Sequence, residues 1–184
     1  MKLENLLSRK RSAIVERWFQ LILDTYPADT SSFLKRQKDR FANPVGNTIS
    51  QGIEGIYDGL VQSEGPDKVS PFLDTIIRIR AIQDFSPSQG VAFVFSLKKA
   101  IREELKDEMR DEEVARELLA LESRIDELAL LSFDIYMKCR EKVYELRANE
   151  VKNRTFKLLE RANLISEVPD LNPGSEGDNV EKKK

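Results

Sequence analysis

Apolar residues recur every three or four positions along most of the chain, which is the period of an amphipathic helix. The first such segment ends at Tyr26-Pro27, because proline disfavours the helical conformation in the residue before it. Turn-forming residues mark loops at 43–46 and 65–67. We therefore predict an all-α protein. The helices cover about residues 3–25, a short stretch through about 37, a segment that begins near the loop at 43–46 and contains residues 48–60, then 68–81, 86–106, and about 50 residues from Asp111.

The segment SPSQGVAFVFSLKK, residues 86–99, contains a β-branched and aromatic run that would also suit a buried strand. The residues before this run favour a helix. Ser86 is a good N-cap, Pro87 suits the first helical turn, and Gln89 completes an S-x-x-Q capping box. We predict a helix that is buried on several sides at its start, with a core stripe and two further aromatic residues: Val91, Val94, Leu97, Ile101, Leu105, Phe93 and Phe95.

The last predicted helix is too long for a small domain. At about 1.5 Å per residue it would measure roughly 75–80 Å, so we expect part of it to project, to break or to pair with another chain. Up to Cys139, its apolar positions alternate steps of four and three residues, as in a coiled-coil or bundle seam. We predict a homodimer through this seam, with candidate interface residues Val114, Leu118, Leu121, Ile125, Leu128 and Ile135, and with Leu119, Leu130, Phe133 and Met137 widening the stripe.

Charge is distributed unevenly over the same part of the chain. Residues 102–127 carry five basic and eleven acidic side chains, whereas residues 138–161 carry eight basic and four acidic ones. Two solvated faces would explain this difference, and so would a docking surface for another protein, because charge complementarity sets specificity and encounter rate. The candidate docking residues are Arg140, Lys142, Arg147, Lys152 and Arg154.

Three glycines, Gly52, Gly55 and Gly59, fall close together on one face of the helix at 48–60. Each costs about 1 kcal/mol relative to alanine in a helix, so we expect an interaction that offsets the cost. Either a close helix crossing or the approach of the backbone to a ligand would do so. Phe93 is the fourth residue of this candidate crossing or pocket.

Two arginines, Arg78 and Arg80, interrupt the apolar face of the helix at 68–81. One interpretation is that they are surface or salt-bridged residues. The other is that they belong to a dimer interface or an anion site, for which the guanidinium group is well suited.

The absence of histidine removes most familiar chemistry. It excludes an imidazole haem ligand, a Ser-His or Cys-His pair and the usual histidine-containing zinc sites. The Gly-rich phosphate-binding motifs are also missing. We expect no cofactor, no metal site and no catalytic residue.

Overall composition bounds the location and the partners. A net charge of −2 gives no reason to expect nucleic-acid binding. No apolar run approaches the roughly 20 residues of a membrane span, and the N-terminus lacks a signal-peptide core. The single cysteine, Cys139, fits a reducing compartment. These features predict a cytoplasmic protein without a membrane span.

Four stretches carry a resemblance to a known family: RSAIVERWFQLILDTYP, DRFANPVGNTI, DTIIRIRAIQDFSPSQGVAFVFSLKKAIREEL and FDIYMKCREKVYELRANEVK. Over about residues 3–155 the chain resembles the RsbRD-type N-terminal domain, the sensory module of stressosome-associated RsbT co-antagonists. The resemblance implies a non-haem, globin-like helical bundle that dimerises and passes a signal through its long C-terminal helix. A polar tail follows the helix where full-length co-antagonists have a STAS domain. We therefore expect a stand-alone member, similar to those of anaerobic sulfur-metabolising bacteria.

The expected organisation is a globin-like sensory and dimerisation domain over residues 1–163, followed by a disordered tail over 164–184. Our first functional hypothesis is a non-catalytic sensory or regulatory dimer whose core gates the signalling helix. The second is an adaptor that docks on a redox or membrane-bound enzyme complex of anaerobic sulfur metabolism. An enzyme is the least favoured, because no set of nucleophile, base and oxyanion donors can be assembled.

Overall fold

The computed structural model describes residues 2–37, 39, 41–83 and 85–162, which contain α-helices, one 3-10 turn and no strand. The predicted all-α class and the long last helix are confirmed. In chain order the elements are α1 (Leu3–Arg9), α2 (Arg11–Leu23), α3 (Ala28–Arg36), α4 (Pro44–Val61), α5 (Pro66–Ile82), α6 (Pro87–Glu104), η1 (Glu108–Arg110) and α7 (Glu112–Arg161). The predicted disordered tail, 164–184, lies outside the described residues.

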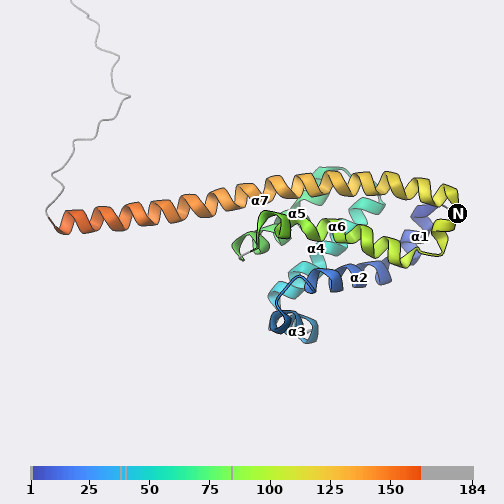
Figure 1. Cartoon of the computed structure of the whole chain (residues 1–184), viewed down its shortest axis with the longest axis horizontal. Helices are drawn as coiled ribbons and strands as arrows, with labels where there is room; N and C mark the ends of the chain where they lie inside the picture. Colours follow the sequence, from blue (N-terminus) through green and yellow to red (C-terminus); the bar gives the residue numbers. More distant parts are fainter. Residues whose placement is uncertain (1, 38, 40, 84, 163–184) are drawn as a thin grey trace, which may run out of the picture. The chain divides into compact units, whose positions relative to one another are not determined.

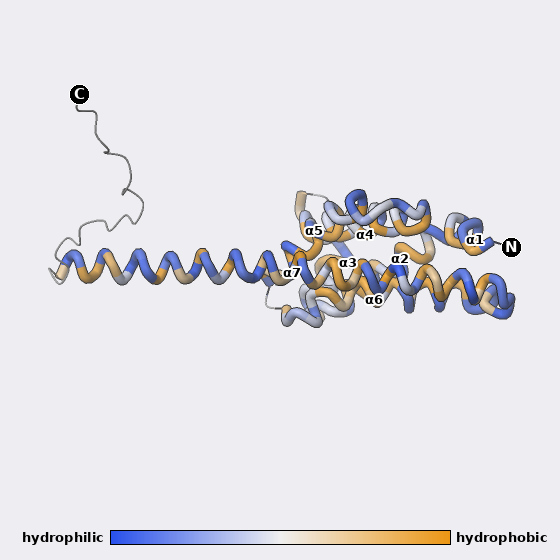
Figure 2. The backbone as a smooth tube through the Cα atoms, turned by 90° about the horizontal axis from the view of Figure 1, so that it is seen from above, coloured by the Kyte–Doolittle hydropathy of each residue, from blue (hydrophilic) through white to orange (hydrophobic). Residues whose placement is uncertain are grey.

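The chain divides into two units, Met1–Val143 and Tyr144–Lys184. In the first unit α4 packs along α5, and α2 packs along α6 (Figure 1). Contacts of α2 with α4 and of α5 with α6 join the two pairs. Apolar and polar residues alternate along the helices with helical period (Figure 2). The apolar faces enclose one core, in which Trp18, Ile53, Leu73, Phe93 and Leu97 are completely buried.

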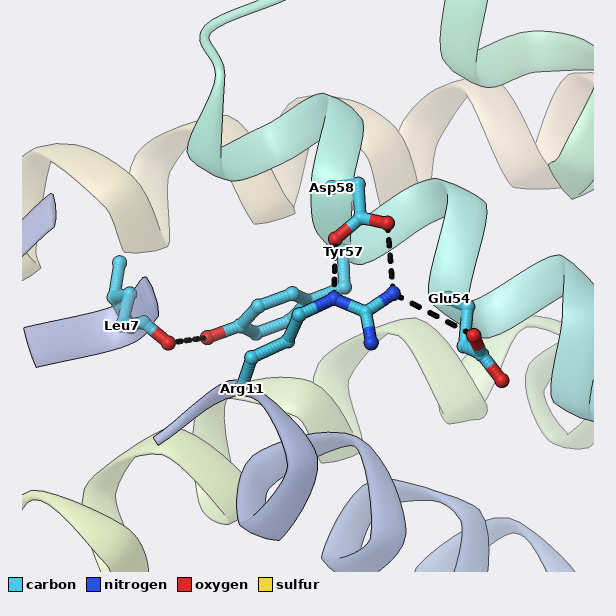
Figure 3. Close-up of polar contacts among 5 residues, drawn as sticks. All are labelled: Leu7, Arg11, Glu54, Tyr57 and Asp58. Atoms are coloured by element: carbon cyan, nitrogen blue, oxygen red, sulfur yellow. Dashed lines mark hydrogen bonds and ion pairs between the residues drawn. The ribbon is translucent and has the colours of Figure 1, made fainter. Parts of the chain in front are cut away.

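The predicted single helix over 3–25 is interrupted at Lys10, which separates α1 from α2. The hydroxyl of Tyr57, on α4, donates a hydrogen bond of 3.0 Å to the carbonyl oxygen of Leu7 (Figure 3). An uninterrupted helix would use this carbonyl to bind the N–H of Arg11. A side chain that enters the hydrogen-bond ladder is a known cause of helix breaks. The break therefore depends on a residue 50 positions away.

Arg11, the first residue of α2, reaches α4 with its side chain (Figure 3). Its Nε and Nη2 atoms each lie 2.7 Å from an oxygen of Asp58, and Nη2 lies 3.5 Å from Glu54. A bidentate pair fixes geometry well, although these partly exposed charges contribute little to stability. Together with Tyr57, this pair fastens the start of α2 to α4.

The α4 helix begins at Pro44, near the place predicted for its start, and it includes most of the expected loop at 43–46. Asn43 is its N-cap, because its Oδ1 accepts a hydrogen bond of 2.8 Å from the N–H of Gly46. Pro44 occupies the first helical turn. The Asn43 amide also donates to the carbonyl oxygens of Leu34 and Gln37. Asn43 thus caps α4 and holds the end of α3 at the same time.

The predicted capping box of α6 is confirmed. The N–H of Gln89 donates to Ser86 Oγ at 3.3 Å, and the N–H of Ser86 donates to Gln89 Oε1 at 2.9 Å. The predicted core stripe of α6 is buried, as is Phe93. Phe95, however, is 47% exposed, so the start of this helix is not buried all round.

The glycine face of α4 lies against α5. A Cβ atom on Gly52 would stand 2.7 Å from Ile76, and one on Gly55 would stand 2.5 Å from the ring of Phe72. At Gly59 the corresponding distance, to Val69, is 2.7 Å. These contacts are those of a close helix crossing, in which the missing side chains let two helices approach. Phe72 covers Gly55 from outside and is 40% exposed.

In the second unit, residues 144–161 are the C-terminal turns of α7, and their side chains are exposed. Tyr144, Val151 and Leu158 follow one another at intervals of seven residues and are all more than half exposed. This spacing places the three side chains on nearly the same face of the helix. The four-and-three pattern from Val114 to Cys139 does not include these three positions, and their apolar spacing was not predicted because polar residues surround them.

The crossing predicts an order of stability losses. Gly52→Leu should lower the free energy of unfolding by about 1–3 kcal/mol or more, because its new side chain meets the fully buried Ile76. Gly55→Leu should cost less, because the exposed ring of Phe72 can turn away. Thermal and urea unfolding of both variants would measure the difference.

Gly65→Ser is the matched control, because no atom lies within 4 Å of a Cβ at this position and serine is a good N-cap. Its melting temperature should equal or exceed that of the unmodified protein. Equal melting temperatures for Gly52→Leu and Gly65→Ser would show that α4 does not approach α5 closely at Gly52.

Candidate ligand site around Arg80

Arg80 is completely buried, although its neighbour Arg78 two positions earlier is exposed. Arg80 lies in the last turn of α5, on the face that also carries Leu73 and Ile77. Its Nη2 donates hydrogen bonds to Thr25 Oγ1 at 3.1 Å and to the carbonyl oxygen of Gln89 at 3.0 Å. This side chain therefore connects α5 to the end of α2 and to the start of α6.

Three aromatic rings surround the Arg80 guanidinium group. Its central carbon lies 4.1 Å from the ring centroid of Phe85, 5.4 Å from that of Tyr26 and 5.8 Å from that of Phe93. Tyr26 and Phe85 meet edge to face. Such cation–π contacts are worth about 0.5–2 kcal/mol each, and the larger values apply to desolvated sites such as this one. The rings stabilise the cation without neutralising it.

The Arg80 charge has no counter-ion among the described residues, where no ion pair joins it to a carboxylate. Its Nε and Nη1 atoms are buried and have no hydrogen-bond partner. Burial lowers the pKa of the guanidinium group below its ordinary value, and the nearby Tyr26 opposes this effect. An unpaired buried charge costs several kcal/mol, so this group is a costly polar feature of the described core.

A pocket of about 380 Å³ adjoins Arg80. It is lined by Thr25, Tyr26, Pro27, Thr30, Gln83, Phe85 and Gln89. Four of these residues contact Arg80, either by a hydrogen bond or through a ring. The hydroxyl of Tyr26 donates to Gln83 Oε1 at 3.1 Å across the lining. The volume is at the lower end of the range for small-molecule sites, about 300–1,000 Å³.

The long helix α7 contacts the same corner of the first unit. The hydroxyl of Tyr136 donates a hydrogen bond of 2.6 Å to the carbonyl oxygen of Phe85. Arg140 Nη1 donates one of 3.1 Å to the carbonyl oxygen of Ala81. Gly90, in the first turn of α6, leaves room for Tyr136: a Cβ there would lie 2.5 Å from its ring. The loop between α5 and α6 is therefore bound to Arg80 on one side and to α7 on the other.

The candidate dimer residues lie mostly inside a single chain. Five of the six are at most 8% exposed and belong to the chain's own core: Val114, Leu118, Leu121, Ile125 and Leu128. Ile135 is partly buried at its edge. The side chains that were predicted to widen the stripe are exposed. Their exposed fractions range from 37% to 71% for Leu119, Leu130, Phe133 and Met137. These four side chains do not belong to the core of the chain.

The candidate docking residues are in several environments. Arg140 already serves its own chain through Ala81, and Lys142 lines a hollow with Asp74 and Arg78. In the second unit Arg147, Lys152 and Arg154 are exposed, and Arg154 pairs with Glu150 one turn earlier.

The residues of the candidate crossing or pocket are also separated. The three glycines face α5, whereas Phe93 contacts Arg80 and stacks on Trp18, whose Nε1 donates 2.7 Å to the Phe93 carbonyl oxygen.

Within the described residues no group of three or more histidine, cysteine, aspartate and glutamate side chains is arranged to hold a metal ion. The Cys139 thiol is partly buried, and this burial raises its pKa above the ordinary value. A thiol of raised pKa is a poor nucleophile near neutral pH. In the same part of the chain no helix is both long and apolar enough to cross a membrane.

The model of the family described as "RsbT co-antagonist protein rsbRD N-terminal domain" matches residues 12–151. The chain belongs to this family. Membership indicates a regulatory, sensory role. An uncharacterized protein of Archaeoglobus fulgidus is 27% identical over 146 residues, which cover 76% of this chain and 83% of that protein. No solved structure matches the chain.

In this RsbRD-type domain the interpretation of Arg80 was left open by the sequence, although a signal was present. Arg80 follows Leu73 by seven residues and Ile76 by four, so it shares their buried face, whereas Arg78 follows Asp74 by four and pairs with it at 2.5 Å. Residue type alone does not distinguish the two arginines. Their positions around the helix do, because Arg80 lies on the buried face and Arg78 does not.

The two arginines should respond differently to truncation. Arg80→Ala should lower the free energy of unfolding by about 2–5 kcal/mol, because it empties a buried site and leaves the ring cluster without its centre. Arg78→Ala should change it by less than about 1 kcal/mol, as expected for an exposed pair. Arg80→Met, which refills the volume and removes the unpaired buried charge, should be about as stable as the unmodified protein. Urea unfolding measures all three, and equal losses for Arg78→Ala and Arg80→Ala would contradict the burial of Arg80.

Proposed function

We propose that this protein is a non-catalytic sensory or regulatory protein that relays a signal from its helical core through α7, and that it acts as a homodimer in the cytoplasm. Family membership supports the regulatory role in general. The single cysteine fits a reducing compartment. The more specific parts of the proposal follow from the contacts of α7.

The observation that carries the relay is the attachment of α7 to the last turn of α5 and to the loop between α5 and α6. Tyr136 is 1% exposed and binds the carbonyl oxygen of Phe85, while Arg140 binds that of Ala81. A change in the position of this loop alters what α7 contacts. A regulatory helix needs such a connection, because coupling passes through elements that both sites bias.

The observation that supports the dimer is the set of exposed apolar side chains on α7. Leu130 and Met137 are seven residues apart in the first unit, with Phe133 between them, and all three are exposed. In the second unit Tyr144, Val151 and Leu158 continue with the same interval. Exposed apolar residues at heptad spacing are typical of a helix that pairs with a second copy.

A second candidate function is an adaptor that docks on an enzyme complex, such as a redox or membrane-bound complex of anaerobic sulfur metabolism. The net positive charge of residues 138–161 favours it. Arg147 and Arg154 follow Tyr144 and Val151 by three residues, so they flank the apolar stripe. Lys152 does not flank it and is the better probe of docking.

The proposed dimer predicts opposite behaviour for two charge insertions in α7. Phe133→Glu, at an exposed position, should give a folded monomer, because a charge cannot be buried cheaply between two chains. Leu128→Glu, at a position that is 6% exposed, should unfold the chain. Sedimentation equilibrium and circular dichroism would distinguish the two results. A wild type that is monomeric and folded at micromolar concentration would remove the dimer.

The docking hypothesis predicts a loss of partner binding without a loss of the dimer. Lys142→Glu/Lys152→Glu should sediment as the wild type and retain less partner protein in a pull-down at low salt. The Arg36→Glu variant, which changes an exposed charge on α3, outside residues 138–161, is the control and should retain the partner. If all three proteins retained the same amount, the positive charge of this segment would have no role in docking.

A further inference from the structure

We propose that the pocket beside Arg80 binds a small organic carboxylate, whose charge is neutralised by the Arg80 guanidinium group. The proposal concerns binding alone and does not require the signalling role. Only the transmission of binding to α7 rests on the proposed function.

The charge of the expected ligand follows from the state of Arg80. The guanidinium is fully buried, and two of its three nitrogens have no hydrogen-bond partner. The third uses a threonine hydroxyl and a peptide carbonyl, which are neutral acceptors. A planar carboxylate matches the fork of a guanidinium group in two parallel hydrogen bonds and adds the missing negative charge. An anion at this place would convert the costly group into a pair.

The position of the pocket makes such a pair possible. Both acceptors of Arg80 Nη2, Thr25 and Gln89, line the pocket, and so do two of the three rings around the cation, those of Tyr26 and Phe85. Thr25 is exposed, so its hydroxyl can exchange the arginine for solvent. A carboxylate that displaces Thr25 from Nη2 would lie in the pocket and in contact with the guanidinium group.

The lining indicates an organic body for the ligand. Tyr26, Pro27 and Phe85 offer apolar surface, while Thr30, Gln83 and Gln89 offer hydrogen-bonding groups. An inorganic ion would leave the apolar surface unused, and a long aliphatic chain would exceed about 380 Å³. A short-chain monocarboxylate fits both the charge and the volume.

Bound ligand would contact the loop that α7 also binds. Phe85 lines the pocket, and its carbonyl oxygen accepts the hydrogen bond of Tyr136. Under the proposed function, occupancy of the pocket therefore changes the hydrogen bond between the Phe85 carbonyl oxygen and the Tyr136 hydroxyl. This is a coupling between ligand and signalling helix across a single residue.

Trp18 provides a direct readout, because it is the only tryptophan and its ring stacks on Phe93, which contacts Arg80. The full chain would be titrated with butyrate, and tryptophan fluorescence and melting temperature would be recorded. Both should change in a saturable way, since a ligand that binds only the folded state raises the melting temperature. Butyramide, with the same shape and no charge, should change neither, and chloride or inorganic phosphate at equal ionic strength should act more weakly.

Two kinds of variant locate the binding. Arg80→Met should weaken butyrate binding by about tenfold or more, as expected for the loss of a charge-assisted bidentate contact. Thr30→Phe fills the mouth of the pocket from an exposed position on α3 and should also abolish binding, even if Arg80→Met fails to fold. Ser32→Phe is its control, because Ser32 lies on α3 outside this lining, and it should bind as the wild type.

Three results would overturn the proposal. The first is an equal response to butyrate and butyramide, which would indicate apolar binding without charge recognition. The second is undiminished binding by both Arg80→Met and Thr30→Phe. The third is binding that appears only when Asp84, four residues after Arg80 in the sequence, is changed to asparagine, since the chain's own carboxylate would then be the counter-ion. None of these results bears on the dimer, which sedimentation tests separately.

Discussion

A buried positive charge determines the packing at the end of the bundle where α2, α5 and α6 meet. The Arg80 guanidinium group holds Thr25 and Gln89 by hydrogen bonds, and it gathers the rings of Tyr26, Phe85 and Phe93 around it. Hydrophobic contacts alone are non-directional and would permit several arrangements of these rings. The cation fixes one of them, because its donors and its face each require a partner in a defined direction. The free-energy cost of burying Arg80 is therefore accompanied by a single defined arrangement of the rings around it.

Where α4 crosses α5, the packing depends on absent side chains and not on a polar group. There the glycines remove side chains so that backbone and neighbouring side chains approach, and Gly52 is in contact with the buried Ile76. This crossing cannot shift by a small amount, because every shift produces an overlap or a cavity. The first unit thus combines a rigid crossing with a corner that contains an unpaired charge and an adjoining pocket. Of these two places, the corner of Arg80 is the one that adjoins the contacts of α7, because Phe85 contacts both Arg80 and Tyr136.

Features that depend on neighbouring residues were predicted well from the sequence. Features that depend on contacts between distant residues were not predicted. The capping box of Ser86 and Gln89 involves residues three apart, so it is visible in the sequence and present in the structure. The break at Lys10 depends on Tyr57, which lies 50 residues from the carbonyl that it binds, and no local pattern indicates it. In the candidate site Phe93 and the arginines were recognised as unusual. The convergence of Arg80 with Tyr26 and Phe85 was not, because it requires the tertiary arrangement of three helices.

The seam of α7 shows why a buried stripe does not identify what covers it. Val114, Ile125 and their neighbours have the spacing of a dimer interface, yet the same chain covers them. A single-chain core and a two-chain core make the same demand on the sequence, which is an apolar residue every three or four positions. What distinguishes them is the apolar surface that remains after the chain has folded. On α7 this remainder is Phe133 with the residues that repeat every seven positions from Leu130, so α7 carries two apolar faces of different use. One face holds the helix against its own core, where Tyr136 binds the carbonyl oxygen of Phe85 beside Arg80, and the other is the exposed face that we propose for a second copy. A helix with both faces can transmit a change from the first to the second by rotation about its own axis, without any change in its length.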